Sequence, residues 1–284
     1  MATKSGRLTK QMTVIISLFL TVLVCSSAHS DASQAPDSAS LCRDQELKNK
    51  VVDAGTSLET FNWKRAAKKN LLMIGDEHTY SDPSDIMKLA NLYRRSSEAR
   101  SICLFLEMPS SIAVNDFKEM LNRKGANPEG RRYQSYFKRI FDQAVVSGFK
   151  IVLADHPNKD QVTDGDRNLF MAKTIQEQLS NNCTHGVIVV GKAHASPNGG
   201  QASLPMNLRA RGVSLTSINL QYAGERAGID NPALESWNNL CSKAASSLNK
   251  AAIFENSKIA KMRIYPKSNY TITFDSFDYT AIFP

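Results

Sequence analysis

Histidine and carboxylate side chains stand at the ends of four apolar runs in the sequence. Residues 75–78, Gly-Asp-Glu-His, follow the first run, and residues 191–194, Gly-Lys-Ala-His, follow the fourth. The second run ends at Glu107, and the third ends at Asp155 and His156. Two imidazoles and several carboxylates can hold a divalent metal ion that activates water. The same groups can also act without a metal, as a general base or nucleophile whose imidazole the carboxylates orient.

The apolar runs have the length and composition of buried parallel strands. They lie within residues 71–74, 102–106, 150–154 and 186–190, and each is rich in Ile, Val or Leu. In a parallel sheet the carboxyl ends of the strands share one edge, which is where open α/β sheets bind ligands. Three of the four histidines beyond residue 30 fall at these ends: His78, His156 and His194. We therefore predict one shared polar cleft; His185 precedes its strand and is predicted to be structural or exposed.

Several of these residues also have a purely structural explanation. The segment from Asp155 to Pro157 could be only a turn, with Pro157 blocking continuation of the strand. Glu107 could lie at a solvated strand edge, but a buried glutamate needs a partner, so a functional role is favoured. Asp76 and Glu77 compete for one inward direction, and the sequence leaves that choice open.

Segments with helical periodicity alternate with these runs, at residues 84–95, 133–146 and 164–179. Further along the chain, we expect a strand at 213–220, a helix at 232–248 and closing strands at 270–274 and 279–283. Strands that alternate with helices of this length indicate β-α-β crossovers. The fold class predicted is α/β: a mostly parallel central sheet flanked by helices, with antiparallel closing strands at the C-terminus.

The first 30 residues have the pattern of a signal peptide. Lys4, Arg7 and Lys10 precede an apolar run at residues 12–25, which is shorter than the ~20 residues that span a bilayer. An uncleaved anchor is an alternative, and a lipid anchor at Cys25 ranks lower because bulky residues precede that cysteine. We predict export to the periplasm or the extracellular space without a stable transmembrane segment, a flexible leader at 31–43 and one domain at 44–284.

The net charge does not indicate a nucleic-acid partner. The chain carries +8, and three of those charges lie in the acid-free residues 1–30, which leaves 8 − 3 = +5 for the remainder. Those charges are spread along the chain, without a basic stripe that alternates with aromatic residues. The partners expected are a small-molecule or peptide substrate.

Four cysteines follow the signal peptide: Cys42, Cys103, Cys183 and Cys241. An even number suits an oxidising compartment, and four cysteines allow three pairings among which the sequence does not choose. The pairs to test first are Cys42 with Cys241 and Cys183 with Cys241. Cys103 lies inside an apolar run and can be explained as a small buried hydrophobic residue.

The paired Gly-x-x-His motifs resemble those of a known superfamily. Residues 74–78 and 190–194 match its two motifs, 106–108 match its acidic strand end, 166–172 are similar to an Arg-x-x-x-Met-Ala helix start, and 277–283 loosely resemble its closing strand. The superfamily joins the ChaN haem-binding lipoproteins, erythromycin esterases, Tiki proteases and TraB proteins. The resemblance covers roughly residues 70–284 and implies that His78, Glu107, Arg167 and His194 belong to the site. Asp76 departs from it, because the ChaN and esterase branches usually have Glu there, and Glu77 could substitute.

The leading functional hypothesis is an exported hydrolase of ester or peptide bonds. His78 and His194, with Glu107 and either Asp76 or Glu77, would activate water, through a divalent metal such as Mn, Co, Zn or Fe. In this hypothesis His78, His194, Glu107 and Asp76 are the metal ligands. Arg167 would stabilise negative charge on the substrate or hold a carboxylate in place.

Two other hypotheses remain open from the sequence. The first is a haem or iron-binding protein of the ChaN type, in which Tyr80 or His156 would contact the cofactor. The second is a toxin-like domain or a non-catalytic scaffold, which the substitution at Asp76 keeps open.

Overall fold

The computed structural model describes residues 53–123, 127–196, 203–222, 250–259 and 277–284, all within one compact unit of the chain. The predicted signal peptide and leader, the helix predicted at 232–248 and the strand predicted at 270–274 lie outside these residues. None of the helices in the described part is both long and apolar enough to cross a membrane.

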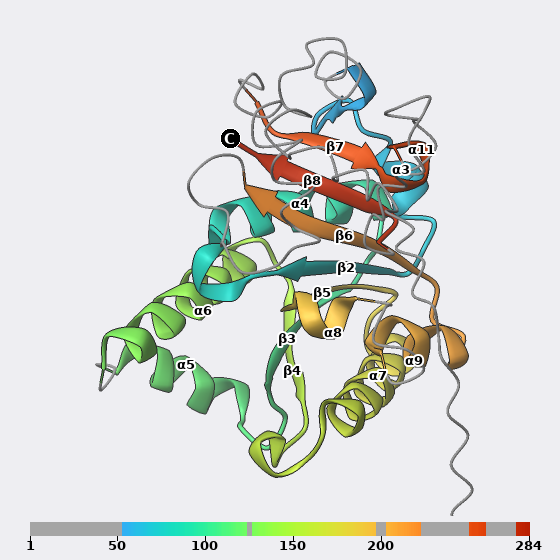
Figure 1. Cartoon of the computed structure of the whole chain (residues 1–284). Helices are drawn as coiled ribbons and strands as arrows, with labels where there is room; N and C mark the ends of the chain where they lie inside the picture. Colours follow the sequence, from blue (N-terminus) through green and yellow to red (C-terminus); the bar gives the residue numbers. More distant parts are fainter. Residues whose placement is uncertain (1–52, 124–126, 197–202, 223–249, 260–276) are drawn as a thin grey trace, which may run out of the picture. The chain divides into compact units, whose positions relative to one another are not determined.

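An eight-stranded sheet forms the centre of the described residues, in the order β1-β7-β8-β6-β2-β5-β3-β4 (Figure 1). The strands from β8 through β6, β2, β5 and β3 to β4 are parallel, whereas β7 pairs antiparallel with both β8 and β1. The predicted fold class is therefore confirmed, including the antiparallel strands near the C-terminus. The strand bounds are β1 (Thr56–Ser57), β2 (Leu71–Asp76), β3 (Ile102–Pro109), β4 (Lys150–Asp155), β5 (His185–Gly191), β6 (Leu215–Tyr222), β7 (Ala252–Glu255) and β8 (Tyr279–Phe283).

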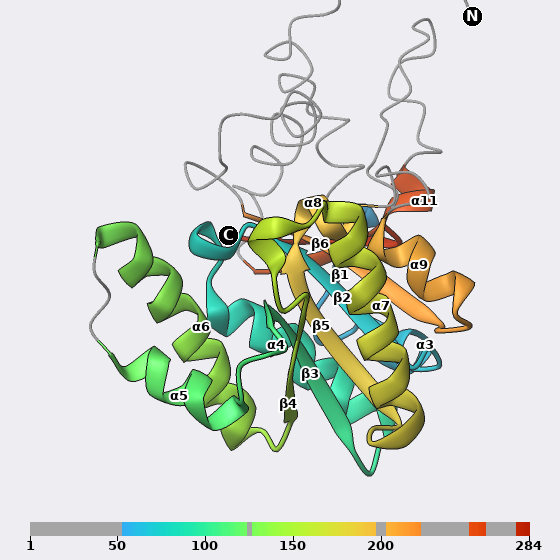
Figure 2. The same cartoon turned by 90° about the horizontal axis from the view of Figure 1, so that it is seen from below.

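Helices cover both faces of the sheet, and side chains that alternate along each strand pack against one set of helices or the other. In β2, for example, Leu72 and Ile74 belong to one apolar cluster, and Leu71 and Met73 belong to the other. The first cluster includes side chains of α3 (Trp63–Ala66), α4 (Pro83–Ser97), α5 (Val114–Asn122) and α6 (Pro128–Val146). The second includes side chains of α7 (Asp164–Asn181), α8 (Lys192–Ala195) and α9 (Leu204–Ala210). Figure 2 shows α5 and α6 on one side of the sheet and α7 and α9 on the other. Short segments η1 (His78–Tyr80), η2 (Lys159–Gln161) and α11 (Asn256–Ile259) complete the described elements.

Capping residues set where the long helices begin. Asp82 caps α4, which starts at Pro83, and Thr163 and Asp166 form a capping box at the start of α7. Helix α6 begins at Pro128 after the N-cap Asn127, five residues before the start predicted from its apolar face. The difference arises because the first turn of α6 is exposed, so hydrophobic periodicity does not mark it.

A disulfide joins Cys103 in β3 to Cys183, which precedes β5, with the two Cα atoms 5.8 Å apart. The suggested pairing of Cys183 with Cys241 is therefore wrong, and Cys103 is more than a small hydrophobic residue. The physical reason is the strand order, because β5 lies directly beside β3 and Cys103 pairs in register with Gly186. Cys42 and Cys241 lie outside the described residues.

Candidate functional site

The ends of four neighbouring parallel strands place polar residues at one edge of the sheet, as the sequence predicted. Asp76 ends β2, Glu107 lies near the end of β3, Asp155 ends β4 and Gly191 ends β5. His78 follows β2 in η1, and His194 follows β5 in α8. Together with Arg167 from the first turn of α7, these side chains form a network that we call the edge cluster: Asp76, His78, Glu107, Asp155, Arg167, Asn168 and His194.

His78 lies between two carboxylates. Its Nδ1 is 2.9 Å from Oδ1 of Asp76, and its Nε2 is 3.4 Å from Oε2 of Glu107. Burial lowers the pKa of His78, but the two carboxylates outweigh burial and raise the pKa to about 10. His78 also has a positive φ of 28°, which is uncommon for a residue other than glycine and occurs often at functional sites. His78 is therefore held in place as an imidazolium at neutral pH.

Asp76 is almost completely buried, with 1% of its surface exposed. Its Oδ2 accepts a hydrogen bond from the hydroxyl of Tyr136, which reaches it from α6. Asp76 shares the face of β2 that carries Leu72 and Ile74, so its direction follows from the alternation of side chains along the strand. The choice that the sequence left open is thus resolved in favour of Asp76.

Glu107 lies at the centre of the cluster and contacts both histidines. Its Oε2 accepts a hydrogen bond of 2.9 Å from the Gly191 N–H, and its Oε1 accepts one of 2.6 Å from Nη2 of Arg167. The same Oε1 is 3.5 Å from Nε2 of His194. Burial raises the pKa of Glu107, but the hydrogen bond to His78, the charge of His194 and the Gly191 N–H together lower it to about 2. Glu107 is therefore a carboxylate at neutral pH.

Arg167 is anchored by Asp155 as well as by Glu107. Its Nε and Nη2 donate to the two oxygens of Asp155 over 3.1 and 2.7 Å, which is the two-pronged geometry that favours a guanidinium–carboxylate pair. Burial lowers the pKa of Arg167, but the carboxylates of Asp155 and Glu107 raise it further. Asp155 has no exposed surface, so it is a buried partner of the cluster rather than only a turn residue.

His194 has one ring nitrogen fixed and the other directed at the cluster. Its Nδ1 is 2.8 Å from the amide oxygen of Asn168, which can accept a hydrogen bond from Nδ1, and Nε2 is directed at the cluster. Nε2 is 3.5 Å from Oε1 of Glu107 and 3.8 Å from Oδ1 of Asp164. Gly75 makes this position possible, because a Cβ there would come within 2.9 Å of Ala195 on α8.

Three residues predicted for the site lie away from these contacts. Glu77 pairs with Lys192 over 2.8 Å, with 31% of its side chain exposed. Tyr80 is 65% exposed. The Nδ1 of His156 accepts a hydrogen bond from the Asn158 N–H, and its ring packs edge-on against Phe170.

Sequence reasoning missed the contacts of Tyr133, Tyr136 and Asn168 with the cluster. It also left open whether Asp155 is only a turn residue. The ring of Tyr133 lies edge-on to His78, with centroids 5.9 Å apart, and burial together with nearby carboxylates raises its pKa, so its hydroxyl stays protonated. Both tyrosines lie in α6, where they read as part of an apolar face. The only available signal for Asn168 was its position next to Arg167.

The edge cluster does not fit the divalent metal that was predicted for it. Among the described residues, no three His, Cys, Asp or Glu side chains are placed so that they could hold a metal ion. Both oxygens of Glu107 already accept hydrogen bonds, from Arg167 and Gly191, and Nδ1 of His78 faces Asp76. His78, His194, Glu107 and Asp76 are therefore engaged with one another and with a guanidinium rather than directed at a common ion.

A haem also finds no clear place among the described residues. Tyr80 offers an exposed hydroxyl, but the other large apolar side chains that are exposed are spread over four helices: Val114 and Met120 on α5, Val145 and Val146 on α6, Leu169 on α7 and Met206 on α9. A porphyrin needs a continuous apolar surface on at least one face.

No protein-family model matches the chain, and no curated protein matches it. Solved structures that are similar include a protein from Bacillus cereus, with 11% identity and a TM-score of 0.48 over 84% of this chain and 96% of that one. ChaN of Campylobacter jejuni, whose structure concerns cofacial haem binding, has 11% identity and a TM-score of 0.41 over 78% and 90% of the two chains. RRSP, a MARTX toxin effector domain from Vibrio vulnificus, has 18% identity and a TM-score of 0.38 over 67% and 41%. These similarities are distant and assign the chain neither to a family nor to an activity.

Proposed function

We propose that the protein is a metal-independent hydrolase that cleaves an ester or peptide bond. The observation that carries this proposal is the contrast between the two histidines on either side of Glu107. His78 lies between two carboxylates that favour its imidazolium form, whereas His194 has Nδ1 held by Asn168 and Nε2 directed at Glu107. An acid and a base that flank one carboxylate are the groups that acyl transfer to water requires.

In the proposed reaction, His194 acts as the base. Nε2 of His194 and Oε1 of Glu107 are both hydrogen-bond acceptors and lie 3.5 Å apart, so a water that donates to both would be oriented between them. As this water attacks the substrate carbonyl, its proton moves to Nε2 of His194. The Asn168 amide oxygen keeps the ring in the tautomer that this step needs.

His78 and Arg167 act on the negative charge that develops during the attack. The imidazolium of His78 donates a hydrogen bond to the carbonyl oxygen or gives its proton to the leaving oxygen or nitrogen. The guanidinium of Arg167 adds positive charge at a fixed place because Asp155 and Glu107 hold it. The resemblance of the paired Gly-x-x-His motifs to erythromycin esterases and Tiki proteases also favours a hydrolase.

The test compares variants on p-nitrophenyl esters and on fluorescently labelled casein, in the presence and absence of EDTA. We expect turnover that EDTA does not affect and that falls about 100-fold or more in His194→Gln and in Glu107→Gln. The matched control is His185→Gln, because His185 starts β5 at the opposite edge of the sheet, where its Nε2 is 3.2 Å from the carbonyl oxygen of Ala67.

Turnover that survives His194→Gln, or that EDTA abolishes, would contradict the proposal. An absorbance spectrum of the same sample tests the haem alternative, since a Soret band would assign the protein to cofactor binding. A folded protein with neither turnover nor haem would favour the non-catalytic scaffold instead.

A further inference from the structure

A pocket of about 410 Å³ lies beside the edge cluster, where α4 and α6 begin. Its lining includes Arg131, Arg132 and Arg139 from α6, together with the hydroxyl-bearing Ser81 and Ser135. Its volume lies within the range of roughly 300–1,000 Å³ that is usual for small-ligand sites. We call it the arginine pocket.

The charge of the arginine pocket is strongly positive. Arg139 is partly neutralised, because its Nη2 is 3.1 Å from Oδ1 of Asp82. Arg131 and Arg132 are exposed, and within the described ranges neither has an ion-pair partner. Acids at the starts of the two helices are Asp82, already paired, Asp85 in the first turn of α4 and Glu129 in the first turn of α6.

The N-terminus of α6 adds to this positive charge, whereas that of α4 is already capped by the Asp82 carboxylate. Pro83 is the first residue of α4 and Pro128 is the first of α6, and both line the pocket. These helices have 15 and 19 residues, so each carries a partial positive charge at its start. Helix starts and arginine forks are both recurrent features of phosphate sites.

The pocket is connected to the edge cluster by two of its own lining residues. Tyr136 lines the pocket, and its hydroxyl donates to the buried Asp76. Ser81 lines it too, and its Oγ accepts a hydrogen bond of 3.1 Å from the Glu77 N–H. A ligand in the pocket would therefore lie one tyrosine side chain away from Asp76 and His78.

We propose that the arginine pocket binds the phosphate group of a small phosphorylated molecule. Arginine suits this ligand because its planar guanidinium donates two parallel hydrogen bonds to phosphate oxygens, and Ser81 and Ser135 add hydroxyl donors. The proposal goes beyond the hydrolase and does not depend on it, because binding requires no chemistry at His194 or Glu107.

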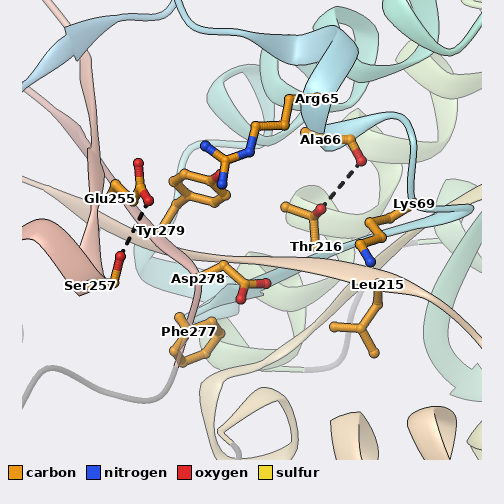
Figure 3. A pocket seen from close by; sticks show the side chains of 10 residues that line it. All are labelled: Arg65, Ala66, Lys69, Leu215, Thr216, Glu255, Ser257, Phe277, Asp278 and Tyr279. Atoms are coloured by element: carbon orange, nitrogen blue, oxygen red, sulfur yellow. Dashed lines mark hydrogen bonds between the residues drawn. The ribbon is translucent and has the colours of Figure 1, made fainter.

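A second cavity in the same chain provides the control. It has a volume of about 360 Å³ and lies at the opposite edge of the sheet, where β6 and β8 begin. Figure 3 shows Arg65, from α3, in this cavity together with Lys69, Glu255 and Asp278. Two basic and two acidic side chains balance one another there, so we expect no phosphate site.

The test is calorimetric titration of the purified protein with inorganic pyrophosphate in a chloride buffer. We expect one saturable site whose affinity falls at least about 10-fold in the double variant Arg131→Gln/Arg132→Gln. The double variant Arg65→Gln/Lys69→Gln removes the same charge from the second cavity and is expected to bind within about 2-fold of the wild type. Thermal unfolding of each variant checks that the fold is kept, which is expected because all four side chains are exposed.

Three results would overturn the proposal. The first is the absence of saturable binding of pyrophosphate to the wild type. The second is unchanged affinity in Arg131→Gln/Arg132→Gln. The third is an equal loss in both double variants, which would mean that pyrophosphate responds to net charge alone.

Discussion

Both edges of the sheet carry acidic and basic side chains, but the acids of the edge cluster are buried at the carboxyl edge, whereas Asp278 at the amino edge is exposed to solvent. At the carboxyl edge, Asp76, Glu107 and Asp155 are buried, and each contacts at least one positively charged group. At the amino edge, Arg65 and Asp278 line an open cavity and are exposed to solvent (Figure 3). Charges that are removed from water must be matched by fixed partners, whereas solvated charges can move. Among the described residues, charges are held in a fixed geometry at the carboxyl edge because burial there forces them to pair.

Removal of Glu107 gives the largest expected effect on stability. In Glu107→Ala, Arg167 and both histidines lose their common carboxylate while they stay largely buried. We expect the free energy of unfolding to fall by about 3–5 kcal/mol, as measured by urea denaturation. Asp278→Ala is the matched change at the amino edge, where the hydrogen bonds that the carboxylate accepts from described residues come from Ser217; we expect a loss of about 1 kcal/mol. Equal losses in the two variants would remove the distinction between the edges.

The Cys103–Cys183 disulfide lies at the amino edge, and its removal tests how much this edge contributes to the free energy of unfolding. Cys103 and Cys183 are 80 residues apart, so their bond closes a long loop in the unfolded chain. We expect the double variant Cys103→Ala/Cys183→Ala to lose about 2–4 kcal/mol of stability by the same measurement. Addition of a reductant should lower the stability of the wild type by more than that of the variant, which keeps Cys42 and Cys241. A wild type that reductant does not affect would contradict the role given to this bond.

A pH series tests the carboxyl edge without replacing a side chain, because it removes one proton from His78. The folded protein raises the pKa of His78 from 6.5 to about 10, so it binds this proton more tightly than the unfolded chain does. The stabilisation is complete below pH 6.5 and is lost progressively as the pH rises to about 10. Urea denaturation at several pH values checks this loss, which should be smaller in His78→Gln. An identical pH dependence in that variant would mean that another group is responsible.

The strand ends and their polar residues could be predicted from the sequence because buried parallel strands leave a clear apolar signal. Glu107, His78 and His194 follow such runs directly, and the shared edge follows from parallel pairing alone. The partners on helices could not be predicted in this way. Tyr136 reads as part of an apolar helix face, and its contact with Asp76 depends on how α6 packs across the sheet.

The disulfide was missed for a different reason. Its prediction requires the strand order, and β5 enters the sheet between β2 and β3 although it follows β4 in the chain. Hydrophobic periodicity identifies strands but does not order them. The same limit applies to the choice between Asp76 and Glu77, which depended on whether β2 continued as far as Asp76.

The disulfide also has a consequence for the order of folding. The loop that it closes contains Glu107, Asp155, Arg167 and Asn168, whereas His78 and His194 lie outside it. Once Cys103 and Cys183 are joined, β3 and the start of β5 are already neighbours, and the slow search for this long-range contact is shortened. In a chain that oxidises early, Glu107, Asp155 and Arg167 would therefore assemble first, and Asp76 and the two histidines would join them last.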